Sequence, residues 1–211
     1  CPVEAIDLNK DGILEIITSY GTGTRALYGN NGSVYWYNPN APLYNKYGVA
    51  GDIDGDGYPE IFVCTSGKIT ALWHNGTIFA ENWTYFPCFG GLALGDTDFD
   101  GVFELYQGDR SISYPEYPSG GRGVQSYWAS NLTLRWYHDW VLCSSQCPTL
   151  ADVDKDGKLD IIIANQRNAA FLVYNTNGDI IRNASGIPGL KSRSEDLREG
   201  KAFISLCSNY H

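Results

Sequence analysis

The chain has 211 residues, of which 43% are hydrophobic and 14% aromatic, a composition that is typical of a globular protein and excludes a disordered one. No apolar run reaches the roughly 18 residues that a membrane helix needs. The net charge of −9 is concentrated, because four short segments hold 15 of the 24 acids while the rest of the chain has an excess of lysine and arginine. The acidity therefore does not indicate a basic partner. No basic stripe indicates nucleic acid, and we expect no membrane insertion in this segment.

The four acidic segments repeat one pattern. Each has an acid at position 1, Asp or Asn at position 3, Asp at position 5, Gly at position 6 and an acid at position 9. They read DLNKDGILEI from Asp7, DIDGDGYPEI from Asp52, DTDFDGVFEL from Asp96 and DVDKDGKLDI from Asp152. A single copy is compatible with a solvated acidic turn, since Asp and Gly are ordinary turn residues. Four copies of the pattern in one chain indicate that these turns have a specific role.

The pattern predicts up to four calcium sites. Alternate acids of a tight turn converge on one point, the glycine permits the bend, and Ca²⁺ takes about 6–8 oxygen ligands. An EF-hand is excluded, because position 12 never carries a carboxylate and β-branched or aromatic residues follow position 9. We expect the ligands to be the side chains of Asp7, Asn9, Asp11, Glu15, Asp52, Asp54, Asp56, Glu60, Asp96, Asp98, Asp100, Glu104, Asp152, Asp154, Asp156 and Asp160, with the position-7 carbonyls of Ile13, Tyr58, Val102 and Lys158. The first site carries one charge fewer, because its position 3 is Asn, and should bind calcium more weakly.

Each repeat has the same predicted elements in chain order. A short strand leads into the acidic loop, a second strand follows the loop, and a hairpin of two further strands comes next. The hairpins read ALYGNNGSVYWY, ALWHNGTIFA, SYWASNLTLRWY and LVYNTNGDII, and most contain Asn-Gly, the strongest short hairpin signal. The loop starts are 45, 44 and 56 residues apart. Such a period with four strands per unit is typical of β-propeller blades.

We therefore predict an all-β fold, a single β-propeller region over residues 1–211 built from four-stranded blades. The repeats span roughly residues 1–46, 47–87, 88–142 and 143–200. Residues 201–211 read KAFISLCSNYH and are similar to the first strand of a further blade. The chain starts at Cys1, inside the first repeat, and contains no Met. We interpret it as a processed or excised segment.

At this point the chain resembles the FG-GAP and VCBS repeat family, in which an FG-like dipeptide and a short strand precede GD-x-D-x-DG-x-x-[DE]. FGGLALGDTDFDGVFEL (89–105) and YGVAGDIDGDGYPEIFV (47–63) match that pattern, whereas the outer two copies keep the loop but lack the FG. The resemblance implies blades similar to the calcium-bearing blades of integrin α-chain propellers, which usually have about seven or eight blades. Three alternatives stay open for the four visible here: a larger propeller, closure with four blades, or completion by neighbouring subunits.

Cysteines and sequons both indicate an extracellular or cell-surface, secreted glycoprotein. We expect disulfides among six cysteines, with buried free thiols as the alternative, and the sequence does not fix the pairing. The cysteines are Cys1, Cys64, Cys88, Cys143, Cys147 and Cys207, of which Cys143 and Cys147 are candidates for a local bridge. The sequons exceed the roughly two expected by chance. They begin at Asn31, Asn75, Asn82, Asn131 and Asn183.

The predicted function is that of a calcium-stabilised structural or adhesion protein, or a surface-filament component, and not of an enzyme. The expected partners are other extracellular proteins, copies of the same chain, and glycans. One alternative is an enzyme of polysaccharide lyase type, for which the candidates Arg110, Arg122, Arg135, His138 and Asp139 form no recognisable catalytic set. The other alternative is a sugar-binding module that stacks exposed Trp on sugars.

Overall fold

The computed structural model describes residues 4–20, 23–41, 48–65, 67–84, 91–108, 123–139, 147–165 and 170–183. All regular structure in these ranges is β-strand, arranged in four sheets of four strands each. The predicted all-β fold is therefore confirmed. No helix in the described ranges is long and apolar enough to span a membrane. The predicted extra strand at 201–211 lies outside the described residues.

We number the sheets blades 1 to 4 in chain order. Blade 1 consists of β1 (Glu4–Ile6), β2 (Glu15–Tyr20), β3 (Gly23–Tyr28) and β4 (Val34–Asn38). Blade 2 consists of β5 (Val49–Gly51), β6 (Glu60–Cys64), β7 (Lys68–Leu72) and β8 (Ile78–Trp83). Blade 3 consists of β9 (Leu92–Gly95), β10 (Glu104–Gly108), β11 (Gly123–Trp128) and β12 (Leu134–Asp139). Blade 4 consists of β13 (Thr149–Ala151), β14 (Asp160–Asn165), β15 (Ala170–Tyr174) and β16 (Ile180–Asn183).

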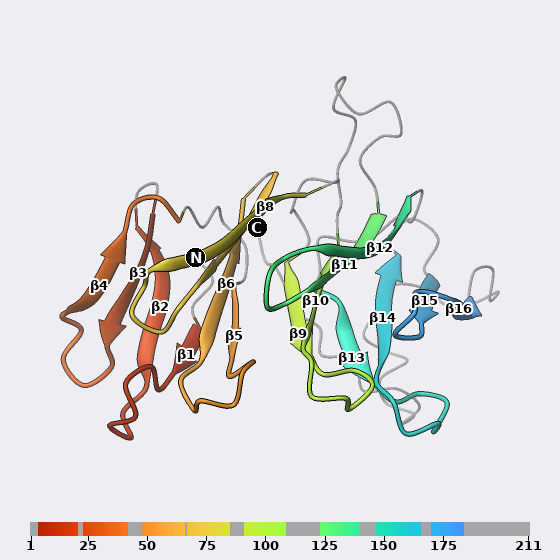
Figure 1. The fold of residues 1–211 in the computed structure, drawn as a ribbon, viewed down its shortest axis with the longest axis horizontal. Coiled ribbons are helices and arrows are strands. Elements are labelled where there is room, and N and C mark those ends of the chain that lie inside the picture. The colour runs from red at the N-terminus through yellow and green to blue at the C-terminus, as the bar shows by residue number, and fades with distance from the viewer. Residues whose placement is uncertain are drawn as a thin grey trace.

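Every blade is an antiparallel meander whose strands pair in chain order. The acidic loop joins the first and second strands, and a tight hairpin, which we call the tip, joins the third and fourth. This is the repeat unit that the sequence predicts. Figure 1 shows the blades side by side along the long axis, with blade 1 at one end and blade 4 at the other. All four acidic loops lie at the same edge, the lower one in this view.

The second strands of the inner blades bury both of their faces, because each of these blades packs between two others. Strand β6 is an example, since all five of its residues are buried. Successive side chains of a strand point to opposite faces. Ile61 and Val63 pack in the cluster between blades 1 and 2, whereas Phe62 and Cys64 pack in the cluster between blades 2 and 3.

The hydrophobic core is accordingly divided into three clusters, one for each contact between neighbouring blades. The first includes Leu8, Ile17, Ala26, Ile61 and Leu72, the second Phe62, Ile69, Leu105, Tyr127 and Leu132, and the third Tyr106, Val124, Ile161, Ile163 and Tyr174. Stability therefore depends on contacts between blades, as is expected when a repeat cannot bury its apolar faces alone.

The tip of each following blade docks against the outermost strand of the preceding one. Between blades 1 and 2, the Trp36 indole Nε1 donates a hydrogen bond to the His74 carbonyl at 3.0 Å. The Asn38 amide donates to the Gly76 carbonyl at 2.7 Å. Gly76 has φ +83° and lies under the indole, so a Cβ placed there would come within 2.5 Å of a Trp36 ring carbon. Only glycine fits beneath this ring.

Blades 3 and 4 repeat the same contact. The Trp136 indole donates to the Thr176 carbonyl at 3.0 Å, and His138 Nε2 is 2.7 Å from the Gly178 carbonyl oxygen. Gly178 has φ +89°, and a Cβ there would come within 2.8 Å of the Trp136 ring. The large flat side chain on one blade is thus matched by a glycine on the next.

Between blades 2 and 3 the sizes of the two residues are exchanged. Ala80 on β8 takes the place of Trp36 on β4. Each residue pairs with the last residue of the third strand before the register shift. The tip position of Gly76 is occupied by Leu132, which is fully buried and packs in the same cluster as Ala80. The hydrogen bond to the tip is kept, because the Asn82 amide donates to the Leu132 carbonyl at 2.8 Å. Leu132 has φ +59°, a conformation that usually costs a non-glycine residue about 1 kcal/mol.

This exchange predicts the outcome of a double substitution. Leu132→Gly should lower the free energy of unfolding by about 2–4 kcal/mol, because it leaves a cavity beside Ala80 that relief of the φ strain only partly offsets. Adding Ala80→Trp should restore much of the loss, because the pair then has the composition of Trp36 and Gly76. Chemical denaturation of the two single variants and the double variant measures this coupling. Simple addition of the two single effects would contradict the proposed size complementarity.

Candidate metal centres

The four acidic loops share one backbone shape, which two left-handed residues produce. At position 6, the φ angles of Gly12, Gly57, Gly101 and Gly157 lie between 83° and 88°. Position 4 is left-handed as well, with φ between 60° and 79° at Lys10, Gly55, Phe99 and Lys155. These turns fold each loop back so that its acids face inward.

Backbone N–H groups then hold one oxygen of most of these acids in place. The position-1 aspartate accepts from the amide of the position-6 glycine in every loop, and Gly57 N to Asp52 Oδ2 at 2.8 Å is one example. The position-5 aspartate accepts from the amide of position 7, as in Tyr58 N to Asp56 Oδ1 at 2.7 Å. The position-9 acid accepts from the amide of position 2, as in Ile53 N to Glu60 at 3.0 Å.

Three of the four loops gather their acids within reach of a single ion. In each of the groups Asp52–Asp54–Glu60, Asp96–Asp98–Asp100 and Asp152–Asp154–Asp160, one oxygen per residue lies within 4.8 Å of the others. Two buried oxygens in these groups, Glu60 Oε1 and Asp98 Oδ1, have no hydrogen-bond partner. A buried carboxylate oxygen without a donor is costly, so these atoms fit a site in which a cation supplies the missing contact.

The electrostatics of the position-9 acids agree with this interpretation. Their side chains are at most 2% exposed. The pKa of Glu60 is raised from 4.5 to about 7, mainly because the side chain is buried; the Ile53 N–H opposes the shift, and the neighbouring charges of Asp54, Asp56 and Asp52 add to it. Burial is also the leading cause of the raised pKa values of the corresponding acids Glu15, Glu104 and Asp160. In each loop, burial therefore makes the charged form of the position-9 acid less favourable when no cation is bound.

The first loop differs because Asn9 occupies position 3. Its Oδ1 accepts from the Asp11 N–H at 2.9 Å, as the position-3 aspartates of the second and fourth loops do with their own position-5 amides. Its Nδ2 consequently faces the acids, at 3.2 Å from Asp11 Oδ2 and 3.5 Å from Glu15 Oε1. An amide N–H₂ is a donor and cannot ligate a cation. In the first loop the Asn9 amide thus donates to carboxylate oxygens that a cation would contact in the other loops.

The third loop differs at position 9. Glu104 Oε2 accepts from the Thr97 N–H and the Thr97 hydroxyl, at 3.0 and 2.7 Å. Its Oε1 lies 3.7 Å from Arg135 Nη1, and the Arg135 guanidinium also stacks over the Trp128 ring. Glu104 therefore has an arginine as its charged neighbour and is not part of the group of three converging aspartates in this loop. The sequence does not indicate this partnership, since Arg135 lies on β12, far along the chain from Glu104.

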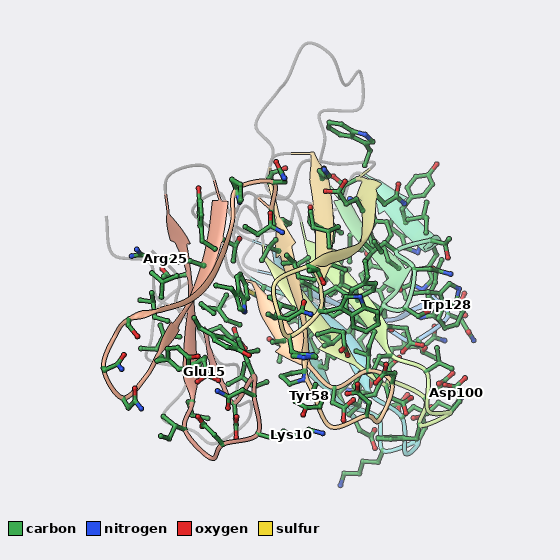
Figure 2. The ribbon with its side chains drawn as sticks, turned by 60° about the vertical axis from the view of Figure 1, so that its left-hand side comes forward. Lys10, Glu15, Arg25, Tyr58, Asp100 and Trp128 are labelled. Carbon is green, nitrogen blue, oxygen red and sulfur yellow. The ribbon has the colours of Figure 1, made fainter. Side chains whose placement is uncertain are left out.

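Neighbouring loops are tied to one another. The Lys10 ammonium donates to the Asp56 carbonyl at 2.6 Å and lies 3.7 Å from the centre of the Tyr58 ring. Figure 2 shows Lys10 and Tyr58 close together at the edge where the acidic loops lie. Loops three and four are joined by the Leu159 N–H, which donates to the Thr97 carbonyl at 2.8 Å. Thr97 also links two blades through its hydroxyl, which lies 2.8 Å from the Tyr106 hydroxyl and 2.9 Å from Thr176 Oγ1.

The predicted glycosylation sites have two kinds of environment. Asn31, Asn75 and Asn131 are exposed residues of the tips, and each uses its Oδ1 to accept from the backbone N–H two residues on. Their amide nitrogens are left for solvent. Asn82 instead donates its amide to Leu132 across the blade contact. The side chain of Asn183 lies outside the described residues.

The other candidate residues are engaged in structural contacts or lie outside the description. His138 contacts the Gly178 carbonyl, and Arg135 contacts Glu104. Arg110, Arg122 and the side chain of Asp139 lie outside the described residues, as do Cys1, Cys88, Cys143 and Cys207. The expected disulfides among the six cysteines therefore stay a prediction.

The raised pKa of Glu60 predicts how the cation-free protein responds to pH. The folded state keeps this proton up to about pH 7, whereas the unfolded chain loses it near the ordinary value of 4.5. Between these values the folded state binds more protons, so the free energy of unfolding should fall as the pH rises. Glu60→Gln should flatten that decrease. Denaturation in EDTA across this range measures it, with the exposed Glu81→Gln as the control, and an unchanged slope in Glu60→Gln would contradict the assignment.

The orientation of Asn9 predicts the number of cations bound. A calorimetric titration of the wild-type chain with Ca²⁺ should give three sites, because the amide of Asn9 faces the acids of the first loop. Asn9→Asp should add a fourth site by replacing the N–H₂ group with a carboxylate oxygen. Asn40→Asp, outside the loops, serves as a control for the added charge. Four sites of equal affinity in the wild type would overturn the role given to Asn9.

Comparison with known proteins agrees with the fold and the loops. Residues 52–106 match the FG-GAP-like repeat family. Solved structures of similar fold include a europium-containing methanol dehydrogenase, with a TM-score of 0.61, 13% identity, and coverage of 83% of this chain and 40% of that chain. BBS1N in complex with ARL6DN gives a TM-score of 0.56 and 13% identity, with coverage of 86% of this chain and 50% of that chain.

A quinohemoprotein alcohol dehydrogenase from Comamonas testosteroni is also similar, with a TM-score of 0.53, 16% identity, and coverage of 82% of this chain and 34% of that chain. The chain thus spans half or less of the length of these structures. No curated protein matches it in sequence. At such identities the similarity shows the fold alone. The predicted resemblance is confirmed at that level: the chain has a β-propeller fold and carries an FG-GAP-like repeat.

Proposed function

We propose that the protein is an extracellular structural or adhesion glycoprotein whose blades are stabilised by calcium. The observation that carries the proposal is the pair of buried, partnerless carboxylate oxygens, Glu60 Oε1 and Asp98 Oδ1, each within a group of three converging acids. Such oxygens are stable only when a proton or a cation is bound. At neutral pH a hard divalent cation is the better occupant, because it neutralises several acids at once.

Calcium suits these loops better than other common cations. The donors of the three groups are carboxylates, with no imidazole or thiolate among them, which disfavours zinc and copper. Magnesium demands a near-ideal octahedron and keeps several waters, whereas calcium accepts irregular sets of oxygens. In the second and fourth loops the residues that would hold the ion are Asp52, Asp54 and Glu60, and Asp152, Asp154 and Asp160. In the third loop they are the three aspartates at positions 1, 3 and 5.

The energetic effect of calcium is large enough to matter. With a Kd of about 0.1 mM and about 1 mM free Ca²⁺, each site adds about 1.4 kcal/mol to the free energy of unfolding. Three such sites add about 4 kcal/mol, a large part of the roughly 5–15 kcal/mol of a typical domain. Because each loop links the first two strands of a blade, the ion would stabilise the strand pairing on which the blade contacts depend.

Two observations support an extracellular location: the calcium loops and the exposed sequons on the tips. Loops that bind calcium weakly fill only where calcium is near millimolar, as outside cells. Three of the five sequons place an exposed asparagine on a tip, with its amide nitrogen available to a glycan. We propose Asn31, Asn75 and Asn131 as the modified sites. Disulfides among the six cysteines would be consistent with this compartment.

The contacts of the candidate catalytic residues favour a structural role over an enzymatic one. Arg135 pairs with a buried glutamate and His138 with a tip carbonyl, so both support contacts within the fold. Two of the solved structures of similar fold are dehydrogenases, but the similarity to them does not transfer an activity at these identities. We expect the partners to be other extracellular proteins, copies of this chain, or glycans.

The proposal predicts the effect of removing calcium. Addition of EDTA should lower the Tm by on the order of 10 °C, given about 4 kcal/mol and the usual entropy of unfolding for a chain of this size. Restoring Ca²⁺ should recover the Tm, and equal Mg²⁺ should not. Differential scanning calorimetry of the three samples is the measurement.

A matched pair of variants locates the effect. Asp54→Asn should reduce the response to EDTA by about one third, because it removes a ligand from one of three sites, while Asp179→Asn in the tip of blade 4 should leave it unchanged. A Tm that does not respond to EDTA in the wild type would refute the stabilising role of calcium. It would leave the fold itself intact.

A further inference from the structure

The side chain of Lys10 leaves its own loop and lies across the second acidic loop. Its ammonium donates to the Asp56 carbonyl at 2.6 Å and lies 3.7 Å from the centre of the Tyr58 ring (Figure 2). The same side chain covers Gly57, because a Cβ built on that glycine would come within 2.6 Å of Lys10 Nζ and 2.9 Å of its Cε. A charged side chain of blade 1 thus contacts positions 5, 6 and 7 of the acidic loop of blade 2.

Among the three loops whose acids converge, only the second has this cover in the described residues. The corresponding glycines of the third and fourth loops, Gly101 and Gly157, are open, and a Cβ built on either would meet nothing within 4 Å. The residues that take the place of Lys10 in the loops preceding them are Gly55 and Phe99. Glycine has no side chain and phenylalanine carries no charge. A lysine from the preceding loop therefore lies over the second loop, and not over the third or the fourth.

Lys10 is held in place at both of its ends. Its backbone N–H donates to Asp7 Oδ1 at 2.7 Å, within a loop that the Asn9 amide helps to shape by donating to its acids. At the other end, the Tyr58 ring over which the ammonium lies is stacked with His74 of the blade 2 tip, with 4.4 Å between the ring centroids. None of these supports involves a carboxylate of the second loop. We therefore expect the position of the ammonium to be the same with and without calcium.

The contacts of Lys10 and its charge have different effects on calcium binding. A hydrogen bond that is present equally in the empty and the filled loop contributes to both states alike, so it does not change the affinity. The charge does change it, because an ammonium attracts the acids of the empty loop and repels a divalent cation in the filled one. Charges interact over roughly 8 Å in physiological salt, and an ammonium that contacts this short loop lies within that range of its acids.

We propose that Lys10 sets the calcium affinity of the second loop, by lowering it and by stabilising the loop when it is empty. The ammonium serves as a counter-ion for Asp52, Asp54 and Glu60 in the absence of calcium, and it opposes the ion when calcium binds. The inference rests on the proposed function, since it assigns an affinity-determining residue to one of the proposed calcium sites. A residue of blade 1 then tunes the site of blade 2, so the calcium response of this loop depends on the contact between the two blades.

The test is a Ca²⁺ titration of the isotope-labelled 211-residue chain, followed by NMR at the backbone amides of Gly57 and Gly157. Each amide donates to the position-1 aspartate of its own loop, so each reports on one site separately. Lys10→Met removes the charge and keeps an apolar side chain of similar length. It is expected to lower the dissociation constant measured at Gly57 by about threefold or more at low ionic strength, and by less at ~0.5 M salt. Lys10→Arg keeps the charge and should retain the wild-type constant.

Chemical denaturation in EDTA tests the effect of Lys10 on the empty loop. There Lys10→Met should unfold at a lower denaturant concentration than the wild type, because the acids of the second loop lose their counter-ion. The same substitution thus strengthens calcium binding and weakens the calcium-free protein. Equal stability of the two proteins in EDTA would contradict the counter-ion role.

Lys155→Met is the matched control, because Lys155 occupies the same left-handed position in the fourth loop. It removes the same charge and should leave the dissociation constant at Gly57 unchanged. A Gly57 amide that does not respond to Ca²⁺ in the wild type would refute calcium binding by this loop, which is a failure of the proposed function. When the wild type does respond, an equal or higher constant in Lys10→Met overturns the role of Lys10. So does an equal decrease at Gly57 in Lys155→Met, which would indicate an effect of net charge alone.

Discussion

The structure depends on the contact between successive blades, because no four-stranded sheet in the molecule covers its own apolar faces. Strand β6 shows the constraint most clearly, with Ile61 and Val63 packed toward one neighbour and Phe62 and Cys64 toward the other. A blade that is removed exposes two apolar faces at once, so the stability of each blade includes the contacts on both sides. The acidic loops act on this arrangement indirectly, by fixing the first two strands of each blade in register at one edge of the molecule.

The loops themselves combine two opposing demands. Backbone N–H groups hold one oxygen of most of the acids, so the site is already shaped before any ion binds. The same arrangement brings the remaining oxygens together and buries the position-9 acid, which raises the pKa of Glu60 to about 7. A preformed site of this kind binds a cation with little loss of conformational entropy, and in its absence the charge of the buried acid is disfavoured. Single side chains explain how the loops differ. In the first loop the Asn9 amide donates to Glu15, and in the third the Arg135 guanidinium lies beside Glu104, so each acid has a partner other than an ion.

Much of the fold was predictable because its signals are local. The acidic pattern and the Asn-Gly turns set the order of strands in each repeat, and the period of the loops indicated blades. The features that sequence did not predict join residues far apart in the chain. Nothing near Ala80 indicates that Leu132 lies opposite it, and nothing near Glu104 indicates Arg135. The orientation of the Asn9 amide also follows from the folded loop, where the Asp11 N–H takes its oxygen. Asn82 matched a sequon, but its amide is used at a blade contact, a role that depends on the neighbouring tip.

The three blade contacts in the described residues follow one rule of size compensation. Within the chain, a large side chain on the outer strand always meets a glycine, and an alanine meets a leucine, so the summed volume at each contact is conserved. Close packing requires such compensation, because an added ring without a matching glycine overlaps with backbone, and a missing ring leaves a cavity.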